Sequence, residues 1–364
     1  MKKRIITHAR NFYARFERPI SSLSLIGGFV FDAITLKRVD TLWENVWVLG
    51  HLLIVALFII LINTNENDAG DAGDPDKANF WYVNILQFFF GGLLSTYLVF
   101  YFRSSDIFVS WPFILILGLA FWANESLKRQ YERLSFQISL FFLSVYSFAI
   151  FLLPVVLHSI GLSIFILSGF ISLLVMWVFL YILRKWSGEK FRKNKHVIAY
   201  CIGGIYLLMN FFYFANLIPP IPLSLKDGDV YHSIVKNQNQ GFLVGYEDHG
   251  WLRYFMLFER THVVLGEPVY VYSAVFSPAQ LDLNVIHEWQ YFDETSHRWV
   301  SRGQVLLPVI GGREDGFRTY SKRDNLEQGD WRVNVETERG EVIGRIRFKI
   351  VPTSTPVPLV YKTI

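Results

Sequence analysis

The residues with the clearest potential to bind a ligand lie in the segment Gly311–Lys322. Its glycines permit tight turns, and it gathers cations, hydroxyl groups and an aromatic ring in a short stretch of chain. Such side chains suit an anionic or sugar ligand. In the alternative reading, the segment only joins two strands and Arg313 pairs with Glu314 or Asp315. The predicted ligand-binding residues are Arg313, Arg318, Tyr320 and Lys322.

A second set of polar residues lies inside long apolar stretches, where an ionisable side chain is a functional candidate. Asp32, His51 and Asn210 would each lie within about 10 Å of the outer membrane surface, because a helix rises about 1.5 Å per residue. They predict one polar cluster that opens toward the C-terminal domain. Alternatively, Asp32 reaches interfacial water while the other two hydrogen-bond between helices.

The sequence lacks the signatures of common catalytic sites: the P-loop, the dinucleotide glycine fingerprint, His-Glu-x-x-His and the nucleophile elbow. The segment nearest to a metal site, His287–His297, places His287 and Glu288 on opposite faces of a predicted strand. Cys201 is the only cysteine, so intramolecular disulfides and cysteine metal sites are excluded. We expect no metal, no cofactor and no catalytic residue.

The N-terminal part of the chain, to about residue 217, has the composition of a membrane protein, and we call it the membrane half. The chain of 364 residues is 52% hydrophobic and 17% aromatic, which is typical of a membrane protein. Seven apolar stretches approach the roughly 20 residues that a spanning helix needs. The first is short and contains Gly27, Gly28 and Asp32, so a re-entrant or interfacial helix is the alternative there. The stretches are Pro19–Leu36, Glu44–Ile62, Phe80–Phe102, Ile107–Ala123, Phe136–Val156, Ile160–Leu183 and Val197–Leu217.

Lysine and arginine indicate the orientation of these spans, because both collect in cytoplasmic loops. With seven spans and a cytoplasmic N-terminus, 16 such residues of the membrane half lie inside and three outside. If the first stretch does not cross, the division is nine to ten. The distribution therefore predicts seven spans and a C-terminal domain on the outer side.

Four segments follow from these patterns. Residues 1–18 are predicted to be a cytoplasmic amphipathic arm, with a solvated arm as the alternative. Residues 19–217 form the helical bundle, 218–226 a stiff proline-rich linker, and 227–364 a separately folding outer domain. Within the outer domain, Trp251, Tyr254, Phe255 and Phe258 form an aromatic stripe that either belongs to the core or rests on the membrane.

The outer domain is predicted to be an all-β, immunoglobulin-like sandwich, because short runs rich in Val, Ile, Tyr and Trp recur between turn signals. It contains no block of basic residues interleaved with aromatics, so no nucleic acid is expected as a partner. The predicted strands are Val230–Lys236, Gly241–Tyr246, Pro268–Phe276, Leu283–Phe292, Arg298–Pro308, Trp331–Thr337 and Val342–Val351.

The last two of these strands form a predicted hairpin. Apolar residues alternate with charged and amide residues through Trp331–Thr337 and Val342–Val351, around a turn at Glu338–Gly340. One face of the hairpin should be buried and the other wet. On an earlier strand, Trp289 is predicted as a core tryptophan and His287 as a hydrogen-bonded core histidine.

The region from Trp289 to Phe348 is also recognisable. It passes through Gly311-Gly312-Arg313, Phe317–Lys322, Gly329–Val333 and Gly344–Phe348. In these runs it resembles the uncharacterised bacterial family called domain of unknown function 2914, and the membrane half is similar to the region that often precedes it. The resemblance implies a bacterial envelope protein and carries no activity, cofactor or catalytic residue.

The expected function is that of a membrane-anchored envelope protein of the bacterial inner membrane. Its periplasmic β-sandwich is expected to bind a protein partner or a glycan without catalysis. The alternatives are a transporter or lipid-handling protein, in which the β-domain regulates or gates the spans, and an enzyme that uses Asp32 and His51. The lipid bilayer is the remaining expected partner.

Overall fold

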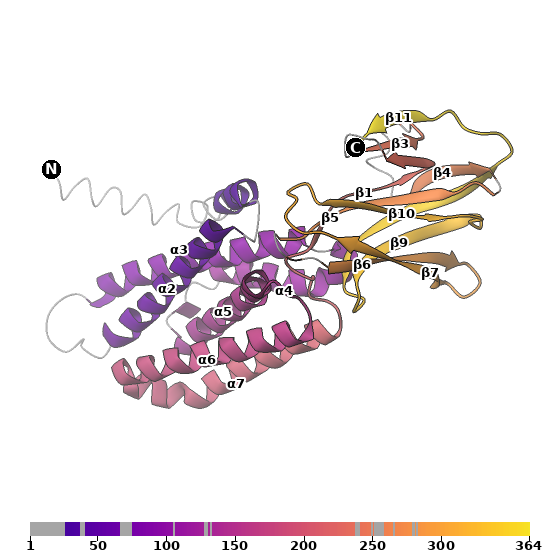
Figure 1. The fold of residues 1–364 in the computed structure, drawn as a ribbon. Coiled ribbons are helices and arrows are strands. Elements are labelled where there is room, and N and C mark those ends of the chain that lie inside the picture. The colour runs from indigo at the N-terminus through magenta and orange to yellow at the C-terminus, as the bar shows by residue number, and fades with distance from the viewer. Residues whose placement is uncertain are drawn as a thin grey trace, which may run out of the picture. The chain divides into compact units, whose positions relative to one another are not determined.

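The fold is that of a computed structural model, in which helices occupy the N-terminal part and strands the C-terminal part (Figure 1). The structure describes residues 26–36, 41–65, 75–104, 106–126, 130–131, 133–236, 241–248, 250, 258–264, 266–278, 281 and 283–364. The predicted arm, residues 1–18, lies outside this set.

The chain divides into two compact units. The helical unit comprises Met1–Phe102, Trp111–Val156 and Leu162–Ala215. The β unit comprises Asn216–Ile364 together with two short segments, Arg103–Ser110 and Leu157–Gly161. The second unit is therefore not continuous in sequence.

Long apolar helices make up the helical unit. Five of them are long and apolar enough to cross a membrane, and two shorter apolar helices, Ile26–Thr35 and Phe108–Asn124, are also found among the described residues. These seven helices match the seven predicted stretches in position, and the number that cross a membrane stays a prediction. The labelled helices are α2 (Leu42–Asn65), α3 (Pro75–Arg103), α4 (Ile107–Ser126), α5 (Leu134–Leu157), α6 (Leu162–Trp186) and α7 (Gly188–Phe214).

Helix α7 begins at Gly188, well before the predicted start at Val197. Its first turns are charged rather than apolar, so an apolar stretch does not report them. An ion pair between Lys193 Nζ and Glu189 Oε1 at 2.8 Å has the i, i+4 spacing that supports a helix. Charged residues thus extend this helix beyond its apolar part.

Helix α5 is the most buried helix of the unit, with aromatic rings packed around it. The rings of Tyr97 and Phe151 lie 5.7 Å apart, and those of Phe141 and Phe179 lie 4.7 Å apart. Both polar and apolar residues of α5 are buried. The buried Gln137 accepts a hydrogen bond of 2.7 Å from Asn63, as expected for a polar group that cannot reach water.

The β unit contains three sheets. Their strand orders are β1-β5-β8, β4-β10-β9-β6-β7 and β11-β3-β2. All strand pairs are antiparallel except β4 and β10, which are parallel. The strands are β1 (Ser224–Tyr231), β2 (Ser233–Lys236), β3 (Phe242–Tyr246), β4 (Glu259–Val264), β5 (Val269–Phe276), β6 (Leu283–Asp293), β7 (Arg298–Val309), β8 (Phe317–Arg323), β9 (Gly329–Thr337), β10 (Val342–Thr353) and β11 (Val360–Thr363).

One apolar core lies between the first two sheets. It includes Val271 of β5, Trp289 of β6, Val333 of β9 and Phe348 of β10, each at most 1% exposed. Apolar residues at alternate positions reach this core because successive strand residues point to opposite faces. The C-terminal all-β domain is therefore confirmed, and its immunoglobulin-like character is considered below.

The hairpin of β9 and β10 is confirmed, with Ile346 opposite Val333 and Phe348 opposite Trp331. Its turn contains Gly340 at a φ of 81°, a backbone conformation that favours glycine. Three strands, β4, β8 and β11, were not predicted. The prediction of a single strand over Val230–Lys236 was wrong, because the chain leaves the first sheet at His232 and enters the third.

Candidate functional site

The predicted ligand-binding segment is a short loop followed by a strand. The prediction of one loop over Gly311–Lys322 was wrong, because β8 begins at Phe317 and pairs with β5. Strand pairing supplies the backbone hydrogen bonds that a loop would leave to water. Arg318, Tyr320 and Lys322 therefore lie on a strand, and only Arg313 lies on the loop.

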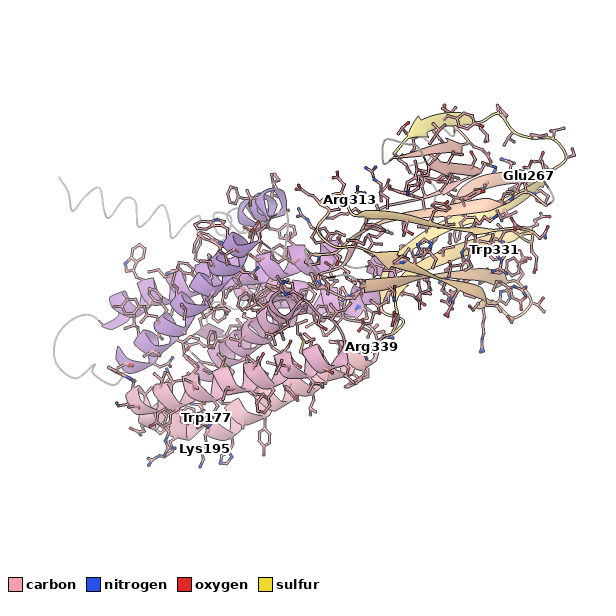
Figure 2. The ribbon with its side chains drawn as sticks, in the orientation of Figure 1. Trp177, Lys195, Glu267, Arg313, Trp331 and Arg339 are labelled. Carbon is pink, nitrogen blue, oxygen red and sulfur yellow. The ribbon has the colours of Figure 1, made fainter. Side chains whose placement is uncertain are left out.

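Two glycines fix this loop against the β unit. A Cβ atom at Gly311 would lie 2.0 Å from the Pro278 carbonyl oxygen, and one at Gly316 would lie 2.8 Å from the Ala274 carbonyl carbon. Only glycine permits such close approaches. Arg313, labelled in Figure 2, is exposed in this loop.

Strand alternation brings the other three predicted residues to one face of β8. Arg318 lies opposite Ala274 in register, Tyr320 opposite Tyr272, and Lys322 opposite Tyr270. The ring of Tyr320 lies 6.0 Å from that of Tyr270 and 5.6 Å from that of Phe242. We call Arg313, Arg318, Tyr320 and Lys322, together with these tyrosines, the β8 face.

The cations of the β8 face have no acidic partner in the part of the chain that the structure describes. Among the described residues, no carboxylate lies within 4 Å of Arg313, Arg318 or Lys322, so the alternative pairing of Arg313 with Glu314 or Asp315 is not observed. Burial raises the pKa of Tyr272 to about 12, while the positive charges of Arg318 and Arg313 act in the opposite direction. Both arginines therefore lie within electrostatic reach of this ring.

The helical unit brings together two of the three predicted intramembrane residues. Asp32 is half-buried, hydrogen-bonds to Ser95 and lies within electrostatic reach of His51. The ring of His51 hydrogen-bonds to the Trp47 carbonyl oxygen at 2.9 Å. The three residues Asp32, His51 and Ser95 come from different apolar helices, which sequence spacing alone does not reveal.

Asn210, the third predicted intramembrane residue, bonds elsewhere. Its side-chain amide donates to the Tyr206 carbonyl oxygen at 2.8 Å and to the Tyr146 hydroxyl at 3.4 Å. This agrees with the alternative of a hydrogen bond between helices.

The inner face of β6 carries a polar group around His287, which is confirmed as a hydrogen-bonded core histidine. Its Nε2 lies 2.8 Å from Ser273 Oγ and its Nδ1 2.9 Å from Ser321 Oγ. Trp289, the confirmed core tryptophan, donates from Nε1 to Ser321 Oγ at 3.0 Å. Burial lowers the pKa of His287 to about 4, so the ring is neutral at pH 7. Glu288 points to the opposite face, as predicted from the alternation.

That opposite face carries a chain of hydrogen bonds that sequence reasoning missed. Arg345 Nε donates to Asn334 Oδ1 at 2.7 Å, and Asn334 Nδ2 donates to Glu288 Oε2 at 3.2 Å. Gln290 Nε2 also donates to Glu288 Oε2, and Arg332 Nε donates to Gln290 Oε1 at 2.6 Å. Each arginine is thus held by an amide, and both amides are held by one carboxylate. We call these five residues the arginine relay.

The relay follows from the strand register. Gln290 lies opposite Arg332 on β6 and β9, and Arg345 lies opposite Asn334 on β10 and β9. The sequence indicated that these residues face away from the core. It could not indicate which residues are cross-strand neighbours, because register is set by long-range pairing.

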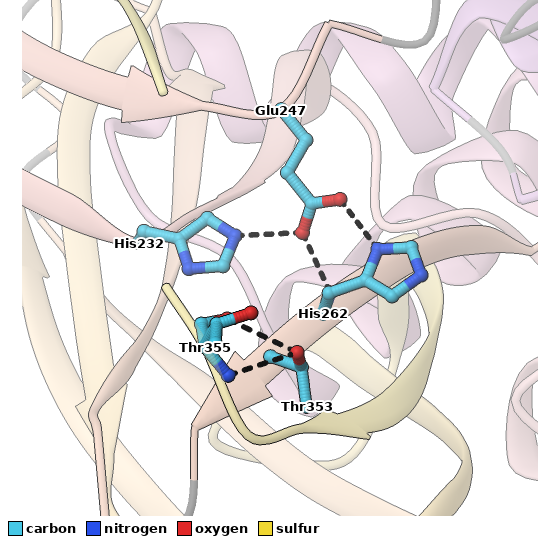
Figure 3. Close-up of polar contacts among 5 residues, drawn as sticks. All are labelled: His232, Glu247, His262, Thr353 and Thr355. Carbon is cyan, nitrogen blue, oxygen red and sulfur yellow. Dashed lines mark hydrogen bonds and ion pairs between the residues drawn. The ribbon is translucent and has the colours of Figure 1, made fainter. Parts of the chain in front are cut away.

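A half-buried carboxylate between two histidines was also missed. Glu247 Oε1 accepts hydrogen bonds from His232 Nε2 at 2.9 Å and from the His262 backbone N–H at 2.6 Å, while its Oε2 accepts one from His262 Nδ1 at 2.7 Å (Figure 3). Burial raises the pKa of Glu247, but these hydrogen bonds outweigh that effect and hold it at about 2. Glu247 joins the segment between β1 and β2 to strand β4.

The remaining predicted features are only partly described. Residues 251–257 of the aromatic stripe lie outside the described part of the chain, while Phe258 stacks at 6.5 Å on Trp299. Asp293, from the segment compared with a metal site, instead accepts hydrogen bonds from Thr295 and Ser296 in a turn. Within the described residues, no group of three His, Cys, Asp or Glu is placed to hold a metal.

Comparisons with known proteins find two solved structures of low similarity and one local match to a protein family. No curated protein matches this chain. An immunoglobulin-like protein from Pseudomonas aeruginosa is similar at 10% identity, over 36% of this chain and 98% of its own, with a TM-score of 0.22. Alkylpurine DNA glycosylase from Pseudomonas fluorescens, bound to DNA containing an abasic site analog, is similar at 10% identity over 86% and 99% of the two chains, with a TM-score of 0.23.

These two structural scores are too low to support an argument about fold or function, so the immunoglobulin-like fold stays a prediction. The match to a protein family is local. The family described as protein of unknown function DUF2914 matches residues 282–350, which run from β6 through most of β10. The resemblance predicted from the C-terminal sequence is therefore confirmed as a match of residues 282–350 to the DUF2914 family.

Proposed function

We propose that this protein is a non-enzymatic binding protein of the bacterial envelope. The helical unit anchors it in the inner membrane with the N-terminus in the cytoplasm. The C-terminal β-domain lies in the periplasm and binds a protein partner or a glycan. The observation that carries the proposal is the β8 face, where Arg318, Tyr320 and Lys322 lie together without an acidic partner in the described chain.

The chemistry of the β8 face suits recognition at a surface. Arginine offers a planar fork of donors for carboxylate or phosphate groups, and tyrosine offers a rigid ring with a polar tip. Strand β8 is an edge of the β1-β5-β8 sheet, so the side chains are presented by regular backbone and not by a loop. A ligand with acidic groups and an apolar face would use both side-chain types.

The anchoring part of the proposal rests on the apolar helices and on the distribution of basic residues. A reporter enzyme fused after Leu225 should be active only in the periplasm. Fusions within Asn63–Asn79 or after Arg192 should report the cytoplasm. A cytoplasmic signal from the Leu225 fusion would refute the proposed orientation.

The binding part is tested with Arg318→Ala in the full chain. We expect the variant to lose about tenfold in affinity for an envelope glycan or envelope protein that the parent binds, since a charge-assisted hydrogen bond contributes about 1.5–3 kcal/mol. Arg298→Ala, at an exposed position of β7, removes the same charge elsewhere in the domain and serves as the control.

Melting temperature separates binding from stability in this test. Unchanged melting with weakened binding supports the β8 face. If Arg318→Ala melts far below the parent, Arg318 is a structural residue. If neither quantity changes, β8 is only a structural strand, and the proposed site is wrong.

The juxtaposition of Asp32, His51 and Ser95 favours a second candidate function, that of a transporter or lipid-handling protein whose β-domain regulates the spans. In that case Asp32→Asn should abolish the cellular phenotype of the gene while Arg318→Ala leaves it intact. Thr35→Ala is the matched control, because among the described residues Thr35 Oγ1 bonds within its own helix, to the Phe31 carbonyl oxygen.

A further inference from the structure

The arginine relay fixes two guanidinium groups, and the described residues accept hydrogen bonds from only part of their donors. Arg332 and Arg345 each donate from Nε to an amide oxygen. A guanidinium group has four further N–H donors on its two Nη atoms. In the described part of the chain, no protein atom accepts a hydrogen bond from the Nη atoms of either residue.

A third arginine adjoins the relay. Arg347 lies directly opposite Arg332 in the β9–β10 register, where side chains are about 5 Å apart at Cβ. Aromatic rings hold both groups: Arg332 lies over Trp299 at 4.3 Å and Arg347 over Phe108 at 4.2 Å, a residue of the same compact unit. All three guanidinium groups are therefore held in place before any ligand arrives.

This clustering of like charge is unfavourable in the folded protein. Like charges directly opposite each other on neighbouring strands are destabilising. Burial lowers the pKa of Arg332 to about 10, and the charges of Arg345 and Arg347 act in the same direction. Asp106, Glu288 and Glu336 lie within electrostatic reach, but among the described residues no carboxylate lies within 4 Å of the three guanidinium groups.

We propose that Arg332, Arg345 and Arg347 form a binding site for a tetrahedral oxyanion of the phosphate class. The site is separate from the β8 face, because it lies on the outer face of the five-stranded sheet and uses strands β9 and β10. A bound phosphate group accepts hydrogen bonds from the Nη atoms and relieves the repulsion among the arginines. All three arginines lie within residues 282–350, the range that matches DUF2914.

Phosphate fits this arrangement better than a carboxylate does. A carboxylate presents two oxygens in one plane, whereas a phosphate group presents three or more oxygens in a tetrahedral arrangement, which suits donors that converge from three guanidinium groups. The source of the phosphate group is either a soluble phosphate ester or an anionic lipid headgroup. Both present the same oxygens.

Calorimetric titration of the purified full chain with inorganic phosphate, at constant ionic strength, tests the site. The chain is held in nanodiscs of phosphatidylcholine. We expect Arg345→Gln to weaken binding about tenfold or more, because it removes a charge-assisted contact. Lys349→Gln should change affinity less than twofold, since Lys349 lies on the same strand and face but pairs with Asp330 at 3.2 Å.

A second variant distinguishes weakened phosphate binding from unfolding of the protein. Arg347 makes no hydrogen bond or ion pair to any described residue and lies opposite the like charge of Arg332, so Arg347→Gln should melt no lower than the parent and still weaken phosphate binding. The proposal is overturned if the parent binds no phosphate, or if Lys349→Gln weakens binding as much as the arginine variants do.

Nanodiscs that contain phosphatidylglycerol distinguish the two sources. If a lipid headgroup occupies the site, the anionic lipid should abolish phosphate binding by the parent and leave the weak binding of Arg345→Gln unaffected. If the ligand is soluble, the parent should bind equally well in both lipids. Either result supports the oxyanion site. Equal effects of anionic lipid on the parent and on Arg345→Gln count against it.

Discussion

Two neighbouring residues of β6, His287 and Glu288, belong to two polar groups that differ in burial, in charge and in how many of their hydrogen bonds are made. His287 points into the core, where two serines bond to its ring nitrogens and burial keeps the ring neutral. Trp289 donates to one of these serines, Ser321. Glu288 points to the other face and is the centre of the arginine relay. The inner group has no net charge at pH 7, whereas the outer group carries several charges and guanidinium donors that no described residue accepts from.

This difference distinguishes polar residues that stabilise the fold from polar residues that are placed to bind a ligand. A buried group whose bonds are all made inside the protein contributes through those bonds and is costly to disrupt. A group that gathers like charges and keeps donors unused lowers stability in the absence of a ligand. We therefore expect substitutions in the two groups to change stability in opposite directions.

The largest effect is expected at the inner group. His287→Leu should destabilise the β unit by about 2–4 kcal/mol, because it leaves the buried hydroxyls of Ser273 and Ser321 without their histidine partner. Thermal unfolding of the full chain, followed by near-ultraviolet circular dichroism, measures this. Arg298→Ala should change stability by less than about 0.5 kcal/mol as the surface control. Equal melting of the two variants would contradict the assigned role of His287.

Glu247 is a charged residue whose hydrogen bonds, like those of His287, are made to other residues of the protein. Glu247→Gln should destabilise the protein by about 1–3 kcal/mol at pH 7, because the carboxylate accepts three hydrogen bonds. The pKa of Glu247 is lowered from 4.5 to about 2, so its contribution is complete above pH 4.5 and is lost as pH falls toward 2. The difference in melting temperature between the parent and the variant should shrink across that window. A constant difference from pH 7 to pH 2 would show that the charge is not involved.

Glu336, on the relay side of β9, should show the smallest effect and the opposite sign. Burial and then the charge of Glu288 raise the pKa of Glu336 from 4.5 to about 7. Its ionisation therefore opposes folding, with a cost that is absent below pH 4.5, grows up to pH 7 and is complete above it. Glu336→Gln should melt like the parent at pH 4 and be more stable by about 1 kcal/mol at pH 8. If Glu336→Gln is less stable than the parent at pH 8, the Glu336 carboxylate stabilises the fold as His287 does.

The sequence was a good guide where the signal is local. Long apolar stretches predicted the helices, and alternation predicted the β9–β10 hairpin and the core positions of His287 and Trp289. Strand β8 was missed because its alternate residues are polar even on the inner face, where Ser321 bonds to His287. Strand β4 was missed because it is short and begins with the charged residues Glu259 and Arg260.

The pattern of apolar residues along the chain indicates which positions alternate and hence which face each strand buries. The tertiary structure alone decided which residues meet: Arg345 with Asn334, Asn334 with Glu288, and Glu247 with His262. The difference arises because one signal is local in sequence and the other depends on residues far apart in sequence. Periodicity follows from the geometry of each element, whereas neighbours across strands depend on a register that the whole core fixes.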